Sequence, residues 1–226
     1  MYQFFIEDEN AAEDFVTIEG SDVNHIKNVL RMKPGEKIRV CTRSGQNYFC
    51  SISDITESFV RADILEKEAE STELPCRIYL FQGLPKNDKM EWIIQKTVEL
   101  GVYEVIPVAM KNCVVKLDDK KAKSKVMRWQ AIAESAAKQS KRSLIPEVKM
   151  PMSYKEAVAY AKELDVKLVP YENEHGMAGT KAAMEQIKKG ESIAVFIGPE
   201  GGFAPEEIAL VQDEMQLISL GKRILR

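Results

Sequence analysis

Short apolar runs separated by turn residues dominate the first third of the chain. The runs occupy residues 2–6, 15–18, 37–41, 48–52 and 60–65. Turn signals such as Pro34-Gly35 and Ser44-Gly45 lie between them. Short strands with this spacing are typical of a small β-barrel. We expect one helix among the strands, where Ser21 is placed to cap a helical repeat of apolar positions.

The pattern changes after a charged segment, residues 66–75, which has few apolar side chains to bury and ends in Pro75. We therefore predict a first domain over residues 1–72 and a second over 73–226. In the second domain, apolar strands alternate with helices, which predicts an α/β fold with a parallel sheet. The expected strands are 77–82, 102–109, 166–171 and 192–197. The expected helices include one capped by Asp88 and Glu91, a basic one over about 122–140, one capped by Ser153 and Glu156, and one around 181–189.

Composition excludes several classes of protein. No run of about 20 apolar residues is present, so we expect neither a membrane span nor a signal peptide, and we place the protein in the cytoplasm. The 4 cysteines form no C-x-x-C pair and the 2 histidines are far apart in sequence. We therefore expect no disulfide framework and no metal site.

Charge is unevenly distributed along the chain. The net charge is −3, yet residues 111–149 hold 11 Lys/Arg against 4 Asp/Glu, whereas residues 1–72 hold 8 against 14. The basic segment is the candidate contact for a polyanion. The alternative is an ordinary solvated helix face.

The most informative segment is a buried strand that leads into a glycine-rich turn, Val195-Phe-Ile-Gly-Pro-Glu-Gly-Gly-Phe203, with Pro205 opening a helix. Ligands bind at this end of the strands in α/β sheets. Pro199 removes an amide donor and Glu200 adds a negative charge, so the turn fits a flat polar ring better than a phosphate. A turn that serves the strand-to-helix geometry alone stays open as the alternative.

Two C-terminal motifs together resemble those of the RsmE family, bacterial 16S rRNA uridine-N3 methyltransferases of the SPOUT superfamily. They are Phe196-Ile-Gly-Pro-Glu-Gly-Gly-Phe203 and Ser219-Leu-Gly-Lys-Arg-Ile-Leu-Arg226. Weaker matches in the same order are Gly83-Leu-Pro-Lys86, Glu99-Leu-Gly101, Glu134–Arg142 and His25–Arg31. The resemblance covers nearly the whole chain.

This resemblance implies a PUA-like β-barrel followed by a SPOUT domain with a trefoil knot, and a homodimer. It also implies that S-adenosylmethionine (AdoMet) binds to three loops. The corresponding residues are Tyr171, Glu172, Ile197, Gly198, Pro199, Gly201, Gly202, Ser219, Leu220, Gly221, Ile224 and Leu225. Glu200 and Arg226 are candidates for removing the N3 proton of uridine or for stabilising the anionic base, with loop bracing as the alternative role of each.

The implied partner is 16S rRNA or the small ribosomal subunit. The residues expected to contact RNA are His25, Arg31, Lys116, Arg128, Lys138 and Arg142. Three departures from the family pattern stand out. Gln3 and Asn112-Cys113 replace Arg and Arg-Ser, and the family's Thr-Glu-Thr-Ala and closing helix do not follow Arg226. We expect a chain without that closing helix to bind AdoMet poorly.

Two other functions remain open from the sequence. A methyltransferase of the same superfamily that acts on tRNA would share the glycine-rich loop. A non-catalytic RNA-binding module would need no cofactor.

Overall fold

The computed structural model describes residues 1–68 and 71–223. These residues form two compact units. The first unit combines Met1–Glu73 with Glu134–Ile145, and the second combines Leu74–Ala133 with the chain from Pro146 onward. The predicted 1–72 and 73–226 domains differ from this division in two respects: the boundary lies one residue later, after Glu73, and the segment 134–145 groups with the first unit.

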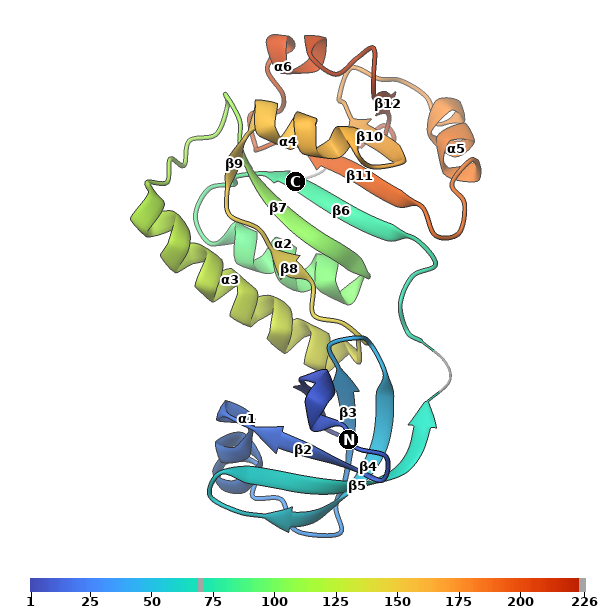
Figure 1. Cartoon of the computed structure of the whole chain (residues 1–226). Coiled ribbons are helices and arrows are strands. Elements are labelled where there is room, and N and C mark those ends of the chain that lie inside the picture. Colours follow the sequence, from blue (N-terminus) through green and yellow to red (C-terminus); the bar gives the residue numbers. More distant parts are fainter. Residues whose placement is uncertain (69–70, 224–226) are drawn as a thin grey trace. The chain divides into compact units, whose positions relative to one another are not determined.

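The first unit is built on a curled five-stranded sheet, shown in blue and cyan in Figure 1. Its strands are β1 (Gln3–Ile6), β2 (Phe15–Glu19), β3 (Lys37–Thr42), β4 (Asn47–Ile55) and β5 (Phe59–Glu68), in the order β1-β3-β4-β5-β2. A 3₁₀ turn, η1, spans Asp8–Asn10. All five predicted strands are confirmed, and alternating apolar residues from them form one buried core. β5 runs further than expected, because Glu66 pairs with Phe49 in what the sequence suggested was linker.

The expected helix begins differently from the prediction. Gly20, with φ +70, is the N-cap residue, and Ser21 is the first residue of α1 (Ser21–Asn24) rather than its cap. The chain continues as a π-helical turn, η2 (His25–Val29). Val23 and Ile26 point into the core as the apolar repeat predicts.

Buried hydrogen bonds fix the segment 134–145 to the curled sheet. The Gln3 amide donates to the Arg142 carbonyl at 2.6 Å, and the Arg39 guanidinium donates to Gln3 and to the Lys141 carbonyl. The Arg142 guanidinium, only 4% exposed, donates from Nε to both carboxylate oxygens of Glu73 at 3.1 and 3.0 Å. Gln3 and Arg142 therefore serve the packing of the first unit.

This ion pair gives a stability prediction. Arg142→Ala leaves the mostly buried Glu73 carboxylate without its cationic partner, with only the Ser143 amide still donating to it, so we expect the free energy of unfolding to fall by about 3 kcal/mol. Arg43→Ala, which removes an exposed partner of Glu7, is the control and should cost less than about 1 kcal/mol. Chemical denaturation measures both values, and equal losses would show that burial of the Arg142 pair carries no weight.

The second unit contains a parallel sheet in the order β12-β10-β11-β6-β7-β8, with β9 also paired to β7. Its strands are β6 (Arg77–Gly83), β7 (Val102–Ala109), β8 (Glu147–Val148), β9 (Met152–Ser153), β10 (Val166–Pro170), β11 (Ser192–Ile197) and β12 (Gln216–Ile218). The four predicted strands are confirmed. The short β8, β9 and β12 were not predicted, because two or three residues are too few to show a period.

Five helices connect or flank the strands of this sheet within the described residues. They are α2 (Lys89–Glu99), α3 (Asp119–Ser140), α4 (Tyr154–Lys162), α5 (Ala178–Glu185) and α6 (Pro205–Ala209). Ser153 and Glu156 form the predicted capping box of α4. Asp88 makes no side-chain cap and contacts Lys125, while Glu91 binds Arg128. α5 begins three residues before the predicted 181.

The core of the second unit lies between α4 and one face of the sheet. Phe81 of β6 stacks on Phe196 of β11 with ring centroids 4.4 Å apart, and Tyr154 of α4 meets Phe196 edge-on. The Tyr154 hydroxyl donates to the Glu207 carbonyl at 3.1 Å. β11 is thus held firmly at the end from which the glycine-rich turn starts (Figure 1).

Candidate functional site

Three loops meet at the carboxyl edge of the parallel sheet. They follow β10, β11 and β12, which are neighbours with β10 in the middle. The Tyr171 amide donates to the Ile218 carbonyl at 3.0 Å. Thr180 of α5 links that helix to the loop after β12, because its hydroxyl donates to the Ser219 carbonyl at 2.8 Å and accepts from the Ser219 amide at 3.0 Å. Neighbouring parallel strands thus place the three predicted cofactor loops side by side.

The glycine-rich turn has a tight internal structure. The Gly202 amide donates to the Pro199 carbonyl at 2.9 Å, and Gly202 has φ +66, a conformation that side chains disfavour. Pro199 lies directly over Gly83 at the end of β6, where an added Cβ would come within 2.7 Å of the proline ring. Glycine at position 83 therefore permits the close approach of the two strand ends.

The glycines of the site differ in what a side chain added to each of them would meet. A Cβ on Gly202 would face Glu172 of the β10 loop, with 3.7 Å to Oε1. A Cβ on Gly201 would face Asn112 instead, 3.1 Å from its Cβ. Gly221, with φ +100, has no atom within 4 Å of an added Cβ. The glycine-rich turn therefore faces the β10 loop through Gly202 rather than through Gly201.

The Glu200 carboxylate is occupied by hydrogen bonds. Its Oε1 accepts from the Lys89 ammonium at 2.7 Å, and both oxygens accept from the Lys86 amide at 3.1 and 3.3 Å. The hydrogen bond from Lys89 lowers the pKa of Glu200 below its ordinary value. The carboxylate consequently stays charged and paired at neutral pH, and the pairing is lost only as the pH falls through that lowered pKa. This arrangement favours the bracing role over that of a proton acceptor.

Two further residues, to which the sequence pattern assigned no role, link neighbouring elements to this edge. Asn112, just after β7, donates to the carbonyls of Gly201 and Gly202. The buried Glu207 of α6 accepts from the Lys111 amide and the Ala204 amide, each at 2.8 Å. Two features of the sequence could have pointed to these residues. Asn112 departs from the family pattern, and Glu207 lies three residues after the N-cap of α6, where a carboxylate can accept from the N-cap amide.

Ile224, Leu225 and Arg226 lie outside the described residues. Of the remaining expected cofactor residues, Ile197 ends β11 and the others lie in the three loops. Ser219 is buried, while Leu220 is 51% exposed. Their assignment to AdoMet stays a prediction.

The expected RNA contacts fall in both units. In the second unit, Lys116 is exposed and Arg128 is 61% exposed while its guanidinium contacts Glu91 at 2.7 Å. In the first unit, His25 and Arg31 are exposed. Lys138 is largely covered and binds Asp22 at 3.0 Å and Glu134 at 2.9 Å. Because Arg142 is buried against Glu73, it has no surface to offer RNA.

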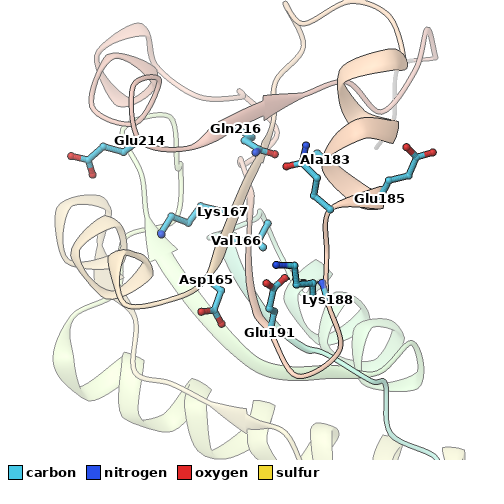
Figure 2. Close-up of a pocket in the computed structure, with 10 residues that line it drawn as sticks. Asp165, Val166, Lys167, Ala183, Glu185, Lys188, Glu191, Glu214 and Gln216 are labelled. Atoms are coloured by element: carbon cyan, nitrogen blue, oxygen red, sulfur yellow. Dashed lines mark hydrogen bonds between the residues drawn. The ribbon is translucent and has the colours of Figure 1, made fainter.

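A polar cavity of about 520 Å³ lies away from these loops. Figure 2 shows its lining, which includes Val166 and Gln216 at the amino ends of β10 and β12 together with Asp165, Lys188 and Glu191. It therefore opens at the opposite ends of these strands. Residues 1–68 and 71–223 contain no cluster of three metal-ligating side chains. Within the same residues, no helix has the length and apolar character required to span a bilayer.

Comparisons with known proteins agree with this arrangement. Residues 72–226 match the RNA methyltransferase domain family, and residues 18–65 match the RNA methyltransferase PUA domain. The chain is 38% identical to ribosomal RNA small subunit methyltransferase E of Bacillus subtilis (strain 168), over 100% of this chain and 91% of the relative. It is 35% identical to the protein of that name from Mesomycoplasma hyopneumoniae (strain 232), over 100% and 93%.

A solved structure is also similar. The ribosomal RNA small subunit methyltransferase E from Neisseria gonorrhoeae, bound to S-adenosyl methionine, superposes with a TM-score of 0.83 at 32% identity, covering 100% of this chain and 91% of that chain. These matches confirm the expected α/β fold, with a PUA-like first unit and an RNA methyltransferase domain as the second unit. The chain belongs to the RsmE family, the ribosomal RNA small subunit methyltransferases E.

Proposed function

We propose that this protein is an AdoMet-dependent methyltransferase that methylates N3 of a specific uridine in 16S rRNA. The observation that carries the proposal is the meeting of the β10, β11 and β12 loops at one edge of the sheet, because these loops hold the motif residues. Support comes from relatives named for action on small-subunit ribosomal RNA and from a related structure with bound AdoMet. The cytoplasm, where ribosomes are assembled, is the compartment that this substrate requires.

The loops fit a cofactor with a flat purine ring. Gly202 and Gly221 have positive φ, and an added Cβ at either position would meet no atom closer than 3.7 Å, so the main chain is open to a ligand. Tyr171, Ile197 to Gly202 and Ser219 to Gly221 would hold the cofactor largely through backbone groups. AdoMet, when bound, supplies an electrophilic methyl group. The chain's own task is to orient the uracil ring and exclude water.

The N3 proton of uridine must leave during the reaction, and Glu200 and Arg226 were the candidates. The pairing of Glu200 with Lys86 and Lys89 supports a brace for the glycine-rich turn. We therefore assign Glu200 to positioning. Arg226 remains the candidate for stabilising the anionic uracil.

A glutamine substitution separates the two roles of Glu200. Glu200→Gln keeps an acceptor for the Lys86 amide, so we expect kcat to stay within about threefold of wild type, whereas removal of a general base costs about 100-fold or more. Glu206→Gln, which loses the exposed pair with Lys111, is the control. Steady-state methyl transfer over a range of AdoMet concentrations gives kcat, and a fall of kcat by two orders of magnitude would restore Glu200 as the base.

RNA recognition is assigned to exposed basic residues of the two units. Lys116 and Arg128 would contact phosphates, and His25 and Arg31 would contact RNA from the PUA-like unit. Lys138 and Arg142 are left to packing because their side chains are already paired.

The trefoil knot and the homodimer also belong to this proposal. The knot is proposed from membership of the RsmE family, and the order β12-β10-β11 places the three loops that would form it on neighbouring strands. Leu210 and Leu220 are each 51% exposed, and an apolar contact between two copies would cover such side chains. Sedimentation equilibrium should give twice the chain mass.

The proposed reaction is tested with purified components. The protein is incubated with methyl-labelled AdoMet and, in separate reactions, with unmodified 16S rRNA, small ribosomal subunits or tRNA. Nucleosides from each digest are then separated and identified by mass spectrometry. Label in N3-methyluridine from the ribosomal substrates is expected. Label in tRNA alone would favour the tRNA methyltransferase, and failure to bind AdoMet would favour the RNA-binding module.

A further inference from the structure

Asn112 lies at the tip of a well-defined turn after β7. The turn is closed by the Cys113 amide, which donates to the Met110 carbonyl at 3.1 Å, and by the Met110 amide, which donates to the Cys113 thiol sulfur at 3.3 Å. The Lys111 amide is held by the buried carboxylate of Glu207 at 2.8 Å. These contacts fix the backbone on both sides of Asn112, so its side chain projects from a defined position.

The Asn112 side chain makes two hydrogen bonds to the glycine-rich turn. Its amide nitrogen donates to the Gly201 carbonyl at 3.0 Å and to the Gly202 carbonyl at 3.2 Å. Both partners are acceptors only, so the orientation of the amide is determined: the nitrogen must face the turn. A glycine pair has the greatest backbone freedom of any dipeptide, and these bonds restrict it.

The consequence concerns the peptide group that joins Gly202 to Phe203. In a trans peptide the carbonyl oxygen and the next amide hydrogen point in opposite directions. Because Asn112 holds the Gly202 oxygen, the Phe203 N–H is directed away from Asn112. Within residues 1–68 and 71–223, the Phe203 amide donates no hydrogen bond. That amide is consequently available to a ligand polar atom.

We propose that Asn112 is a positioning residue that fixes the Gly201 and Gly202 peptide groups, and through them the Phe203 amide, for binding of AdoMet. This inference rests on the proposed function of the three loops. It assigns to Asn112 a role in cofactor affinity rather than in contact with RNA.

Two substitutions test the proposal by calorimetric titration of the full chain with AdoMet. Asn112→Ala removes both hydrogen bonds, so we expect roughly tenfold weaker binding at all pH values. Asn112→Asp at pH 8 places a carboxylate against two carbonyl oxygens, and binding should be weaker than in the alanine variant. The two carbonyl oxygens that face the carboxylate disfavour its charged form and raise the carboxyl pKa, and the protonated form can donate one hydrogen bond. The affinity of Asn112→Asp should therefore recover several-fold between pH 8 and pH 5.5.

Asn28→Asp is the matched control. The Asn28 amide is exposed and donates to the Asn24 side-chain oxygen in the first unit, so this variant should bind AdoMet as wild type does at every pH. Wild-type affinity in both Asn112 variants, or equal weakening without pH-dependent recovery in Asn112→Asp, would overturn the role of Asn112. If the wild-type chain itself does not bind AdoMet, the proposed function fails instead.

Discussion

Gly202→Val is expected to abolish detectable AdoMet binding, with affinity lowered at least about 100-fold, because a branched side chain would enter the space bordered by the cofactor loops. The added Cβ faces Glu172 across this space, and the two further methyl groups of valine reach deeper into it. Calorimetry on the full chain measures the loss. The measurement is informative only if the fold survives, since φ +66 also strains any side chain.

Gly190→Val is the matched control for that strain. Gly190 has φ +92 and no atom within 4 Å of an added Cβ, and it lies at the amino end of β11, away from the loops. Both variants should lose about 1–2 kcal/mol of unfolding free energy from backbone strain, but only Gly202→Val should lose the cofactor. Unchanged affinity in Gly202→Val, or equal losses in both variants, would move the cofactor away from the glycine-rich turn.

Neutralising Lys116 and Arg128 is expected to weaken binding to 16S rRNA about 10- to 30-fold at 0.1 M salt while leaving AdoMet affinity unchanged. With each phosphate contact that is lost, fewer counterions are released from the RNA when the protein binds. The double variant Lys116→Gln/Arg128→Gln should therefore lower the slope of log affinity against log salt by about 1.5. Filter binding or fluorescence anisotropy over a salt series gives both quantities.

The control for this variant removes the same charge elsewhere. Lys181 and Lys189 are exposed in or just after α5, so Lys181→Gln/Lys189→Gln should leave the slope unchanged. A reduced slope in the control and not in the test variant would place the RNA-binding surface near α5 instead.

Most strands and helices of this fold could be predicted from the sequence, because apolar residues recur in them at the regular spacing of a strand or a helix. The β11 strand, its glycine-rich turn and Pro205 are local signals, and the structure places them as expected. The α4 capping box at Ser153 is equally local. Such features depend on residues within a few positions of each other, which is the range that sequence patterns report.

Features that depend on distant partners were missed or misjudged. Glu91 was expected to form a capping box with Asp88 at the start of α2, but its carboxylate accepts a hydrogen bond from Arg128, 37 residues later. Arg142 sits in a basic segment and was assigned to RNA, yet the carboxylate of Glu73 pairs with it in the interior. Asn112 was noted only as a departure from the family pattern, because its two acceptors lie about 90 residues away along the chain. A pattern along one sequence does not contain these pairings.

The most direct test of the proposed function is the state of 16S rRNA in cells that lack this protein. Small-subunit RNA is isolated from the deletion strain, from that strain carrying the gene, and from that strain carrying the Gly202→Val variant, and fragments are mapped by mass spectrometry. We predict that one N3-methyluridine is absent in the deletion strain, returns with the wild-type gene and stays absent with the variant. An unchanged 16S rRNA with the loss of a methylated nucleoside from tRNA would contradict the assignment.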